Sequence, residues 1–251
     1  FKPDNNLRNY YRELDISNAI SKVSYEIDGI KYTREYFISY PDQVMVIKLT
    51  SSLKGALNFD VKFTSLLRHT TSCKAGVLKM SGSAPLHAEP IYRGDMPHAI
   101  VFAENRGTRF ASLVKIMNTG GIITQSDTTL GLSGGTEAVI LVSMATSFNG
   151  FNKNPASEGL NEIGLAEGIL QKCIPKSFSQ LKSSHVKDYQ AYFNRVNLNL
   201  GLSSAPDLPT NERLKRYAKG EEDKNLEILY FQFGRYLLIS SSRTEGVPAN
   251  L

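Results

Sequence analysis

The hydrophobic pattern of this chain changes its period once, and that change constrains the fold more than any other feature. Up to about residue 149, short apolar runs are separated by glycine-containing turns. Beyond that point, apolar residues recur every three or four positions, which is the period of an α-helix. The sequence therefore predicts an all-β first part followed by helices.

The clearest local signal in the first part is Asp28-Gly29, which stands between two strand-like runs at 19–27 and 30–40. Gly accepts the positive φ of a tight type I′ turn, so this dipeptide predicts a hairpin. Further strands are predicted at 44–49, 57–63, 76–80, 100–103, 110–117, 122–125, 129–132 and 138–145. Turn signals at 119–121 and 133–135 separate the later strands, and this spacing favours an antiparallel sandwich or barrel over a βαβ sheet.

Four helices are predicted in the second part, at 157–172, 178–196, 210–220 and from Asp223 to about 240. Thr210 is the predicted N-cap of the third, short and basic helix. The acidic run Glu221-Glu222-Asp223 suits the positive end of the fourth helix, which carries a broad apolar face. Ser240, Ser241 and Ser242 are expected to form a C-terminal turn.

Composition excludes several classes of protein. The chain has 251 residues, of which 41% are hydrophobic and 21% charged, as in a folded globular protein. No apolar run approaches the roughly 18 residues needed to cross a bilayer, so no membrane partner is expected. The net charge of +5 comes from basic residues scattered along the strands. Nucleic-acid binding is not expected either, because such a face needs clustered charge.

The four histidines, His69, His87, His98 and His185, do not have the spacing of metal ligands. The first three are predicted in or beside loops and the fourth on a helix, and hydrogen-bonded or solvated roles are expected. The segment 85–90 is the most interesting, because His87 and Glu89 stand in a loop framed by prolines, of a kind that often faces a ligand.

Other motifs assign no chemistry. Cys73 and Cys173 are too few for a disulfide framework or a CxxC zinc site, and we expect them not to be bridged. Cys73 is predicted in a loop and Cys173 at a helix end. G-x-S-x-G and HExxH are absent, and the glycine clusters do not spell a phosphate-binding loop. These motifs therefore assign no catalytic, cofactor-binding or metal-binding residue, and no cofactor is predicted; a carboxylate pair for glycoside hydrolysis cannot be identified by spacing, because its members usually come from distant positions.

Several segments, taken in order along nearly the whole chain, resemble glycoside hydrolase family 95, the α-L-fucosidases and their relatives. The resemblance lies in residues 11–16 (YRELDI), 23–37, 41–44 (PDQV), 145–151 (ATSFNGF), 185–190 (HVKDYQ), 208–218 (LPTNERLKRYA) and 230–243 (YFQFGRYLLISSSR). Each segment alone is a weak signal, but their order is specific.

This resemblance implies a mainly β fold: an antiparallel β-supersandwich, an α-helical linker and the first helices of an (α/α)6 barrel. Residues 1–175 would be an N-terminally incomplete sandwich, 176–201 the linker helix and 202–251 the start of the catalytic barrel. The chain is expected to begin inside the sandwich and to end before the rest of the barrel. The family's general acid Glu and its water-activating Asn and Asp lie beyond residue 251, so none is carried over.

Two functions follow as hypotheses. In the first, the chain is a fragment of an inverting exo-α-L-fucosidase or α-L-galactosidase that acts on fucosylated oligosaccharides, inactive alone and completed by missing segments of the same protein. In the second, it is a stand-alone carbohydrate-binding or scaffold β domain. The apolar helix after Asp223 favours the first, because an independent sandwich does not need it. The family also suggests a periplasmic or secreted bacterial protein.

Overall fold

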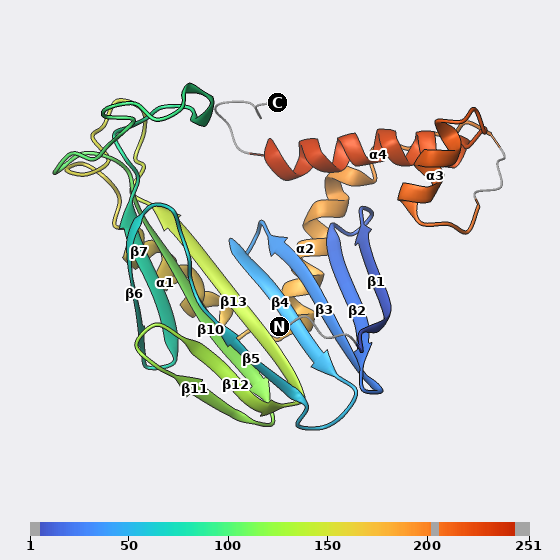
Figure 1. Cartoon of the computed structure of the whole chain (residues 1–251), viewed down its shortest axis with the longest axis horizontal. Coiled ribbons are helices and arrows are strands. Elements are labelled where there is room, and N and C mark those ends of the chain that lie inside the picture. Colours follow the sequence, from blue (N-terminus) through green and yellow to red (C-terminus); the bar gives the residue numbers. More distant parts are fainter. Residues whose placement is uncertain (1–5, 202–205, 244–251) are drawn as a thin grey trace. The chain divides into compact units, whose positions relative to one another are not determined.

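The computed structural model describes residues 6–201 and 206–243, which divide into two compact units (Figure 1). The β unit comprises residues up to Glu13 together with Ser21–His185, and the helical unit comprises Leu14–Ile20 together with the residues from Val186 onward. The strands are β1 (Arg8–Asp15), β2 (Ile20–Ile27), β3 (Ile30–Ser39), β4 (Val44–Ser51), β5 (Leu57–Val61), β6 (Arg68–Lys74), β7 (Val77–Ser83), β8 (His87–Ala88), β9 (Ile100–Val101), β10 (Arg109–Thr119), β11 (Ile122–Gln125), β12 (Leu130–Gly135) and β13 (Glu137–Thr146). The helices are the 3₁₀ turn η1 (Ile91–Arg93), α1 (Glu162–Cys173), α2 (Phe178–Phe193), α3 (Thr210–Tyr217) and α4 (Lys224–Ser241).

Two sheets form the body of the β unit. The large sheet has eight strands in the order β1-β2-β3-β4-β13-β10-β7-β6, and a smaller sheet has the order β11-β12-β5. The pairings β2–β3, β3–β4, β4–β13, β13–β10, β10–β7 and β7–β6 are all antiparallel. Together with the helices that follow, this architecture confirms the predicted fold class: mainly β, antiparallel, then helical.

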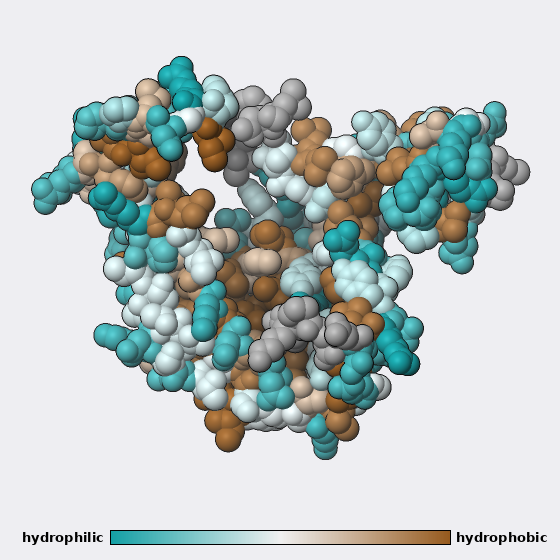
Figure 2. All heavy atoms as spheres, viewed as in Figure 1, coloured by the Kyte–Doolittle hydropathy of each residue, from teal (hydrophilic) through white to brown (hydrophobic). Residues whose placement is uncertain are grey.

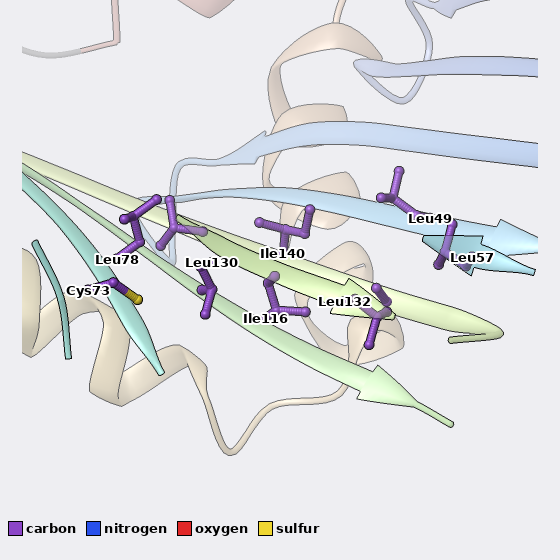
Figure 3. Packing of buried hydrophobic residues seen from close by; sticks show 10 residues of the cluster. Leu49, Leu57, Cys73, Leu78, Ile116, Leu130, Leu132 and Ile140 are labelled. Atoms are coloured by element: carbon purple, nitrogen blue, oxygen red, sulfur yellow. The ribbon is translucent and has the colours of Figure 1, made fainter. Parts of the chain in front are cut away.

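The main core lies between these two sheets, and Figure 3 shows its side chains pointing at one another. Alternate positions along each strand supply it, as expected when one face of a strand is buried. The large sheet contributes Leu49, Cys73, Leu78, Val114, Ile116, Ala138 and Ile140, and the small sheet contributes Leu57, Leu130 and Leu132. Removing one of the fully buried leucines would cost about 2–5 kcal/mol of stability.

Helix α1 covers the opposite face of the large sheet, over β13, β10 and β4. Its inner side carries Ala166 and Leu170, both fully buried. The buried hydroxyl of Ser143 on β13 donates to the carbonyl of Ala166 at 2.9 Å. A polar residue is tolerated in this layer because the hydrogen bond satisfies it. The sheet is thus buried on both faces over its central strands.

The Asp28-Gly29 hairpin forms as predicted. Asp28 has φ 51° and Gly29 φ 76°, so both central residues adopt the positive φ of a type I′ turn. The second predicted glycine turn, at 133–135, does not form. Ser133–Gly135 belongs to β12, where Gly134 has φ 70° and the pairing with β5 shifts register between Leu132 and Gly135. This segment is a β-bulge inside a strand, which an isolated Ser-Gly-Gly sequence does not distinguish from a turn.

Three strands were not predicted: β1, β6 and β8. Strands β1 and β6 are the outermost strands of the large sheet, so each pairs along one edge only. In β6 only Cys73 is buried, and in β1 no residue is buried. Their sequences therefore lack the apolar alternation by which strands are recognised. As a consequence, Cys73 lies in a strand and not in the predicted loop.

Helix boundaries differ from the predictions by a few residues. The helix expected from 157 begins at Glu162, after the N-cap Asn161 accepts a hydrogen bond from the amide of Gly164. The expected N-cap Thr210 is instead the first residue of α3, whose N-cap is Pro209 and makes no side-chain bond. Ser240 and Ser241 lie in the last turn of α4, and only Ser242 caps it.

The helical unit is built around the second half of α2 and around α4. The rings of Tyr189 and Tyr236 meet edge to face with centroids 6.4 Å apart. The guanidinium of Arg235 donates to the carbonyls of Val196 and Tyr192 at 2.9 and 3.2 Å. Tyr189 also donates its hydroxyl to the carbonyl of Ile16 at 2.7 Å. Burial raises the pKa of this phenol well above its ordinary value, so Tyr189 is neutral and acts as a donor.

Candidate functional site

The structure separates the four histidines. His69 lies on β6, not in a loop, and its Nδ1 is 2.8 Å from the carbonyl oxygen of Leu67. His98 lies in a loop with φ 58°. His185 is on α2 as predicted and is buried, with its ring stacked on Phe37 at a centroid distance of 4.9 Å. Among the described residues, no group of three or more His, Cys, Asp or Glu side chains could hold a metal ion.

The candidate loop at 85–90 lies within a longer excursion, residues 84–108, which leaves the sheet after β7 and returns at β10. His87 is in the short strand β8, which pairs with β9. The Nε2 of His87 is 2.9 Å from one carboxylate oxygen of Glu89, and the Nη1 of Arg93 donates to the other at 3.0 Å. Glu89 is therefore held between two basic groups, and this arrangement braces the loop.

A second polar cluster joins the turn after β3 to the end of α1. Asp42 accepts hydrogen bonds from Lys176 Nζ and from the hydroxyl of Ser39, the latter at 2.6 Å. Burial opposes ionisation of Asp42, but the bonds from Lys176 and Ser39 outweigh it and keep the pKa of the carboxyl below its ordinary value. The cluster is a satisfied ion pair that fixes two segments of the β unit.

Both cysteines are buried, and they are not bridged, as predicted. Burial raises the pKa of the Cys73 thiol, and burial together with the nearby Asp42 raises that of Cys173. The Sγ of Cys173 lies 3.6 Å from the carbonyl oxygen of Asp42. A thiol with a raised pKa and no access to solvent is a poor nucleophile, so neither cysteine is a catalytic candidate.

The acidic run before α4 has a structural role at its last member. Asp223 is the N-cap, and its Oδ1 accepts the amide hydrogen of Leu226 at 2.9 Å. Arg213 on α3 donates to both carboxylate oxygens, each at 2.8 Å. The bonds from Arg213 are the main reason that the pKa of Asp223 is below its ordinary value. From the sequence we expected only a favourable interaction of the acidic run with the helix dipole. The ion pair between Asp223 and Arg213 of α3 was not predicted.

Helix α4 leaves much of its apolar surface exposed within the described part of the chain. Tyr230 is 80% exposed and Leu238 is 62% exposed, and these two side chains lie eight positions apart on one side of the helix. No helix among the residues 6–201 and 206–243 has the length and apolarity needed to cross a membrane.

Comparisons with known proteins agree with this division of the chain. Residues 1–150 match the N-terminal domain of glycosyl hydrolase family 65, and residues 177–251 match the catalytic domain of glycosyl hydrolase family 95. The chain thus combines a match to the N-terminal domain of one glycosyl hydrolase family with a match to the catalytic domain of another. Over more than half of its length the chain belongs to the family of the glycosyl hydrolase family 65 N-terminal domain, and its last 75 residues are similar to the catalytic domain of family 95, the family that the sequence resembles.

Individual relatives extend over most of this chain but continue well beyond it. Alpha-L-fucosidase 2 of Arabidopsis thaliana is 35% identical over 260 residues, covering 96% of this chain and 30% of the relative. A probable alpha-fucosidase A of Aspergillus niger is 30% identical, with the same coverages. The chain therefore spans about a third of the length of these relatives. A solved structure of a putative kojibiose phosphorylase from the human microbiome overlays on 74% of this chain and 25% of its own, with a TM-score of 0.48 and 11% identity.

Proposed function

We propose that this chain is the N-terminal β domain and adjoining helices of an inverting exo-α-L-fucosidase that acts on fucosylated glycans. One observation carries the proposal: relatives named as α-fucosidases align with 96% of the chain, and its last 75 residues, 177–251, match a family 95 catalytic domain. In this proposal, residues 1–175 are the sandwich domain, 176–201 the linker helix and 202–251 the first helices of an (α/α)6 barrel.

The carboxylates of this chain support a structural role for it. Inversion needs a protonated carboxyl group on one side of the sugar and a carboxylate base on the other, about 6.5–9.5 Å apart. Four carboxylates of this chain are each bonded to a cation: Asp42 to Lys176, Glu89 to Arg93, Glu162 to Arg109 and Asp223 to Arg213. The bonds from Lys176 and Arg213 help to lower the pKa of Asp42 and Asp223 below its ordinary value, which makes these two carboxyl groups poor proton donors at neutral pH. We therefore place the acid and base in the remainder of the parent protein.

The exposed face of α4 supports this proposal over a stand-alone carbohydrate-binding domain. Exposed aromatic and aliphatic side chains at Tyr230 and Leu238 are costly on a module that works alone. The same stripe is expected on a helix that forms part of a larger helical domain. We also infer a periplasmic or secreted location, for which the family resemblance is the support.

The test is the release of fucose from 2′-fucosyllactose. The parent protein, extended through its catalytic domain, should release fucose, and an early proton NMR time course should show the inverted β-anomer before mutarotation. The 251 residues alone should release none. Turnover by these 251 residues, abolished by a substitution within them, would show that the active site lies in this chain. Absence of turnover by the folded parent, or retention of configuration, would overturn the proposed activity or its mechanism.

A further inference from the structure

Three lysines on neighbouring strands of the large sheet lie on the same face of that sheet. They are Lys74 on β6, Lys79 on β7 and Lys115 on β10. Each follows directly after a residue of the main core, and these core residues are Cys73, Leu78 and Val114. Successive side chains of a strand point to opposite faces, so the three lysines point away from the core. We call the surface formed by these lysines and the outward side chains beside them on β6 and β7 the lysine face.

The register of the strands determines how close the three lysines are. Lys79 pairs with Ser72 on β6 and with Leu113 on β10. Lys74 and Lys115, each two positions further along, are therefore its diagonal neighbours, at roughly 7–8 Å between backbones. Lys74 and Lys115 are two strands apart, at roughly 10 Å. Charges that are scattered in the sequence are thus brought into one triangle by the antiparallel pairing of the strands.

No carboxylate neutralises this triangle within its own strands. The sequences of β6, β7 and β10 contain no Asp or Glu. Among residues 6–201 and 206–243, no ion pair involves Lys74, Lys79 or Lys115. The Nζ of Lys115 donates to the carbonyl of Ala75 at 3.4 Å, and an ammonium has two further protons to donate. Lys74 is exposed and the other two lysines are partly exposed, so all three can meet a ligand.

A purely structural role explains one of the three lysines. Charged side chains on an edge strand hinder its pairing with another chain, and lysine is the residue most used for this. Lys74 fits that role, because β6 is an edge strand of the large sheet. Lys79 and Lys115 do not fit it, since β7 and β10 are paired on both sides. Their unbalanced charge is therefore the observation that indicates a ligand.

The side chains beside the lysines limit the chemistry of that ligand. They are mainly hydroxyl groups, and those of Thr70 and Ser81 lie 3.4 Å apart on the same face as Ser72. Neither β6 nor β7 contains Phe, Tyr or Trp, on which the bases of a nucleic acid could stack. The edge of the sheet beside this face is polar too, since Figure 2 shows mainly pale and teal residues at the left of the view, along β6. Ammonium and hydroxyl groups together suit a ligand that carries both anionic groups and hydroxyls.

We propose that the lysine face binds a sulfated polysaccharide, with Lys74, Lys79 and Lys115 contacting sulfate groups and the neighbouring hydroxyls contacting the sugar. An ammonium is a compact point charge that suits a sulfate, whereas the planar fork of arginine is the better match for a carboxylate. A carbohydrate is favoured over other anions because the chain matches domains of two glycosyl hydrolase families. This binding site goes beyond the proposed function and does not depend on the release of fucose.

The test compares two double variants that lose the same charge from different places. Lys74→Gln with Lys79→Gln removes two charges from the lysine face. Lys54→Gln with Lys153→Gln is the control, because it removes two charges from exposed loop positions of the β unit. Fluorescent heparin fragments are titrated with the full-length parent and with the 251-residue chain, and the dissociation constant is obtained from fluorescence anisotropy.

The original protein should bind heparin, and salt should weaken this binding because it screens charges on a surface. The change at positions 74 and 79 should raise the dissociation constant at least about fivefold, the loss expected for two surface charge contacts. The control should raise it less than about twofold, since charges beyond the screening length contribute little. Equal losses in the two variants would mean that heparin responds only to net charge, and would overturn the proposal. Absence of binding by the parent would overturn it too.

Two other polyanions test the chemistry of the ligand. Polygalacturonate carries carboxylates and no sulfate, and a DNA duplex carries phosphates. Both should bind more weakly than heparin at the same salt concentration, DNA because this face offers no ring for its bases. Polygalacturonate binding as tightly as heparin would reject the assignment to sulfate groups. Tighter binding of DNA, lost on changing Lys74 and Lys79, would assign the face to nucleic acid and reject the proposal.

Folding and activity are measured beside binding, so that the results can be separated. Thermal unfolding should be the same for both double variants and the original protein, and the single change Lys74→Gln, on the edge strand, gives a second measurement if the double variant is less stable. A parent that binds heparin through the lysine face but releases no fucose would reject the proposed function and leave this site standing. A parent that releases fucose and does not bind heparin would reject this site alone.

Discussion

Asp223 shows how a single carboxylate can serve two helices. It caps α4 through the amide of Leu226 and pairs with Arg213 of α3 through both oxygens. Both side chains are largely buried, so water does not replace either partner well. Loss of the carboxylate leaves a helix end and a guanidinium unsatisfied together.

We expect Asp223→Ala to lower the free energy of unfolding by about 3 kcal/mol at pH 7, the sum expected for a lost N-cap and a broken, mostly buried ion pair. The folded pKa of Asp223 is lowered, so its contribution is present above the unfolded pKa and is lost as the pH falls through the folded value. Urea unfolding at pH 7 and at about pH 3 should therefore show a smaller penalty in acid.

The matched control is Glu212→Ala, which removes an exposed pair with Lys215 on the same helix. It should change stability by less than about 0.5 kcal/mol, as surface pairs generally do. An equal penalty for Asp223→Ala at both pH values would show that its charge is not what stabilises the α3–α4 junction.

At the scale of single residues, the sequence predicted in which element a residue lies better than it predicted which side chain that residue contacts. The position of Asp223 before an apolar helix was evident, and the unbridged cysteines followed from their number and spacing. The bond from Arg213 could not be predicted, because it depends on how α3 folds back beside α4. Likewise, no local signal placed His185 against Phe37, which lies far away in the sequence.

At the scale of single elements, two glycines in the β unit differ in whether their backbone conformation requires glycine. Gly29 has φ 76° in the hairpin turn, and a Cβ added there would meet nothing within 4 Å. Gly168 lies inside α1, exposed, and a Cβ there would also meet nothing. The two positions therefore differ in backbone conformation and not in available space.

Gly29→Ala should destabilise the protein by about 1 kcal/mol, because an L-residue is strained at this φ. Gly168→Ala should stabilise it by about 0.5–1 kcal/mol, since alanine loses less backbone entropy in a helix. Thermal unfolding of the two variants beside the original protein would reveal shifts of opposite sign. Shifts in the same direction would mean that contacts at these sites, and not φ, control the outcome.

Element prediction succeeded where one face of a strand or helix is buried. Strands β4 and β10 were predicted to within two residues, because their inner positions are apolar and buried. Strand β11 was predicted with its bounds, although none of its four residues is buried. It failed at β1 and β6, which have solvent on one edge and few buried residues. It also failed at Ser133–Gly135, because a bulge and a turn use the same residue types.

At the scale of the whole molecule, the exposed stripe on α4 has a consequence for solution behaviour. We expect the 251-residue chain to self-associate, because Tyr230, Leu238 and their neighbours are left without cover among the described residues. The double change Tyr230→Ser with Leu238→Ser should weaken association at least several-fold, as seen by sedimentation velocity or light scattering over a range of concentrations.

Leu53→Ser is a suitable control, since Leu53 is a similarly exposed side chain in the turn after β4. It should leave association unchanged. A stable monomer at every concentration, with one cooperative unfolding transition, would contradict the role given to α4 and weaken the proposal that this helix belongs to a larger domain.

The order of strands in the large sheet also determines when that sheet can be completed during synthesis. Strands β1 to β4 follow one another in sequence and in space, but the next strand in the sheet is β13, so that Val44 pairs with Ser143. At ribosomal rates, on the order of ten seconds separate the emergence of these two partners. Until β13 emerges, the free edge of β4 has no partner from its own chain and is open to pairing with another. Strand β13 is thus the last strand to enter the sheet, where it pairs with β4 and β10, and the wait for it is the stage at which a nascent chain is most open to error.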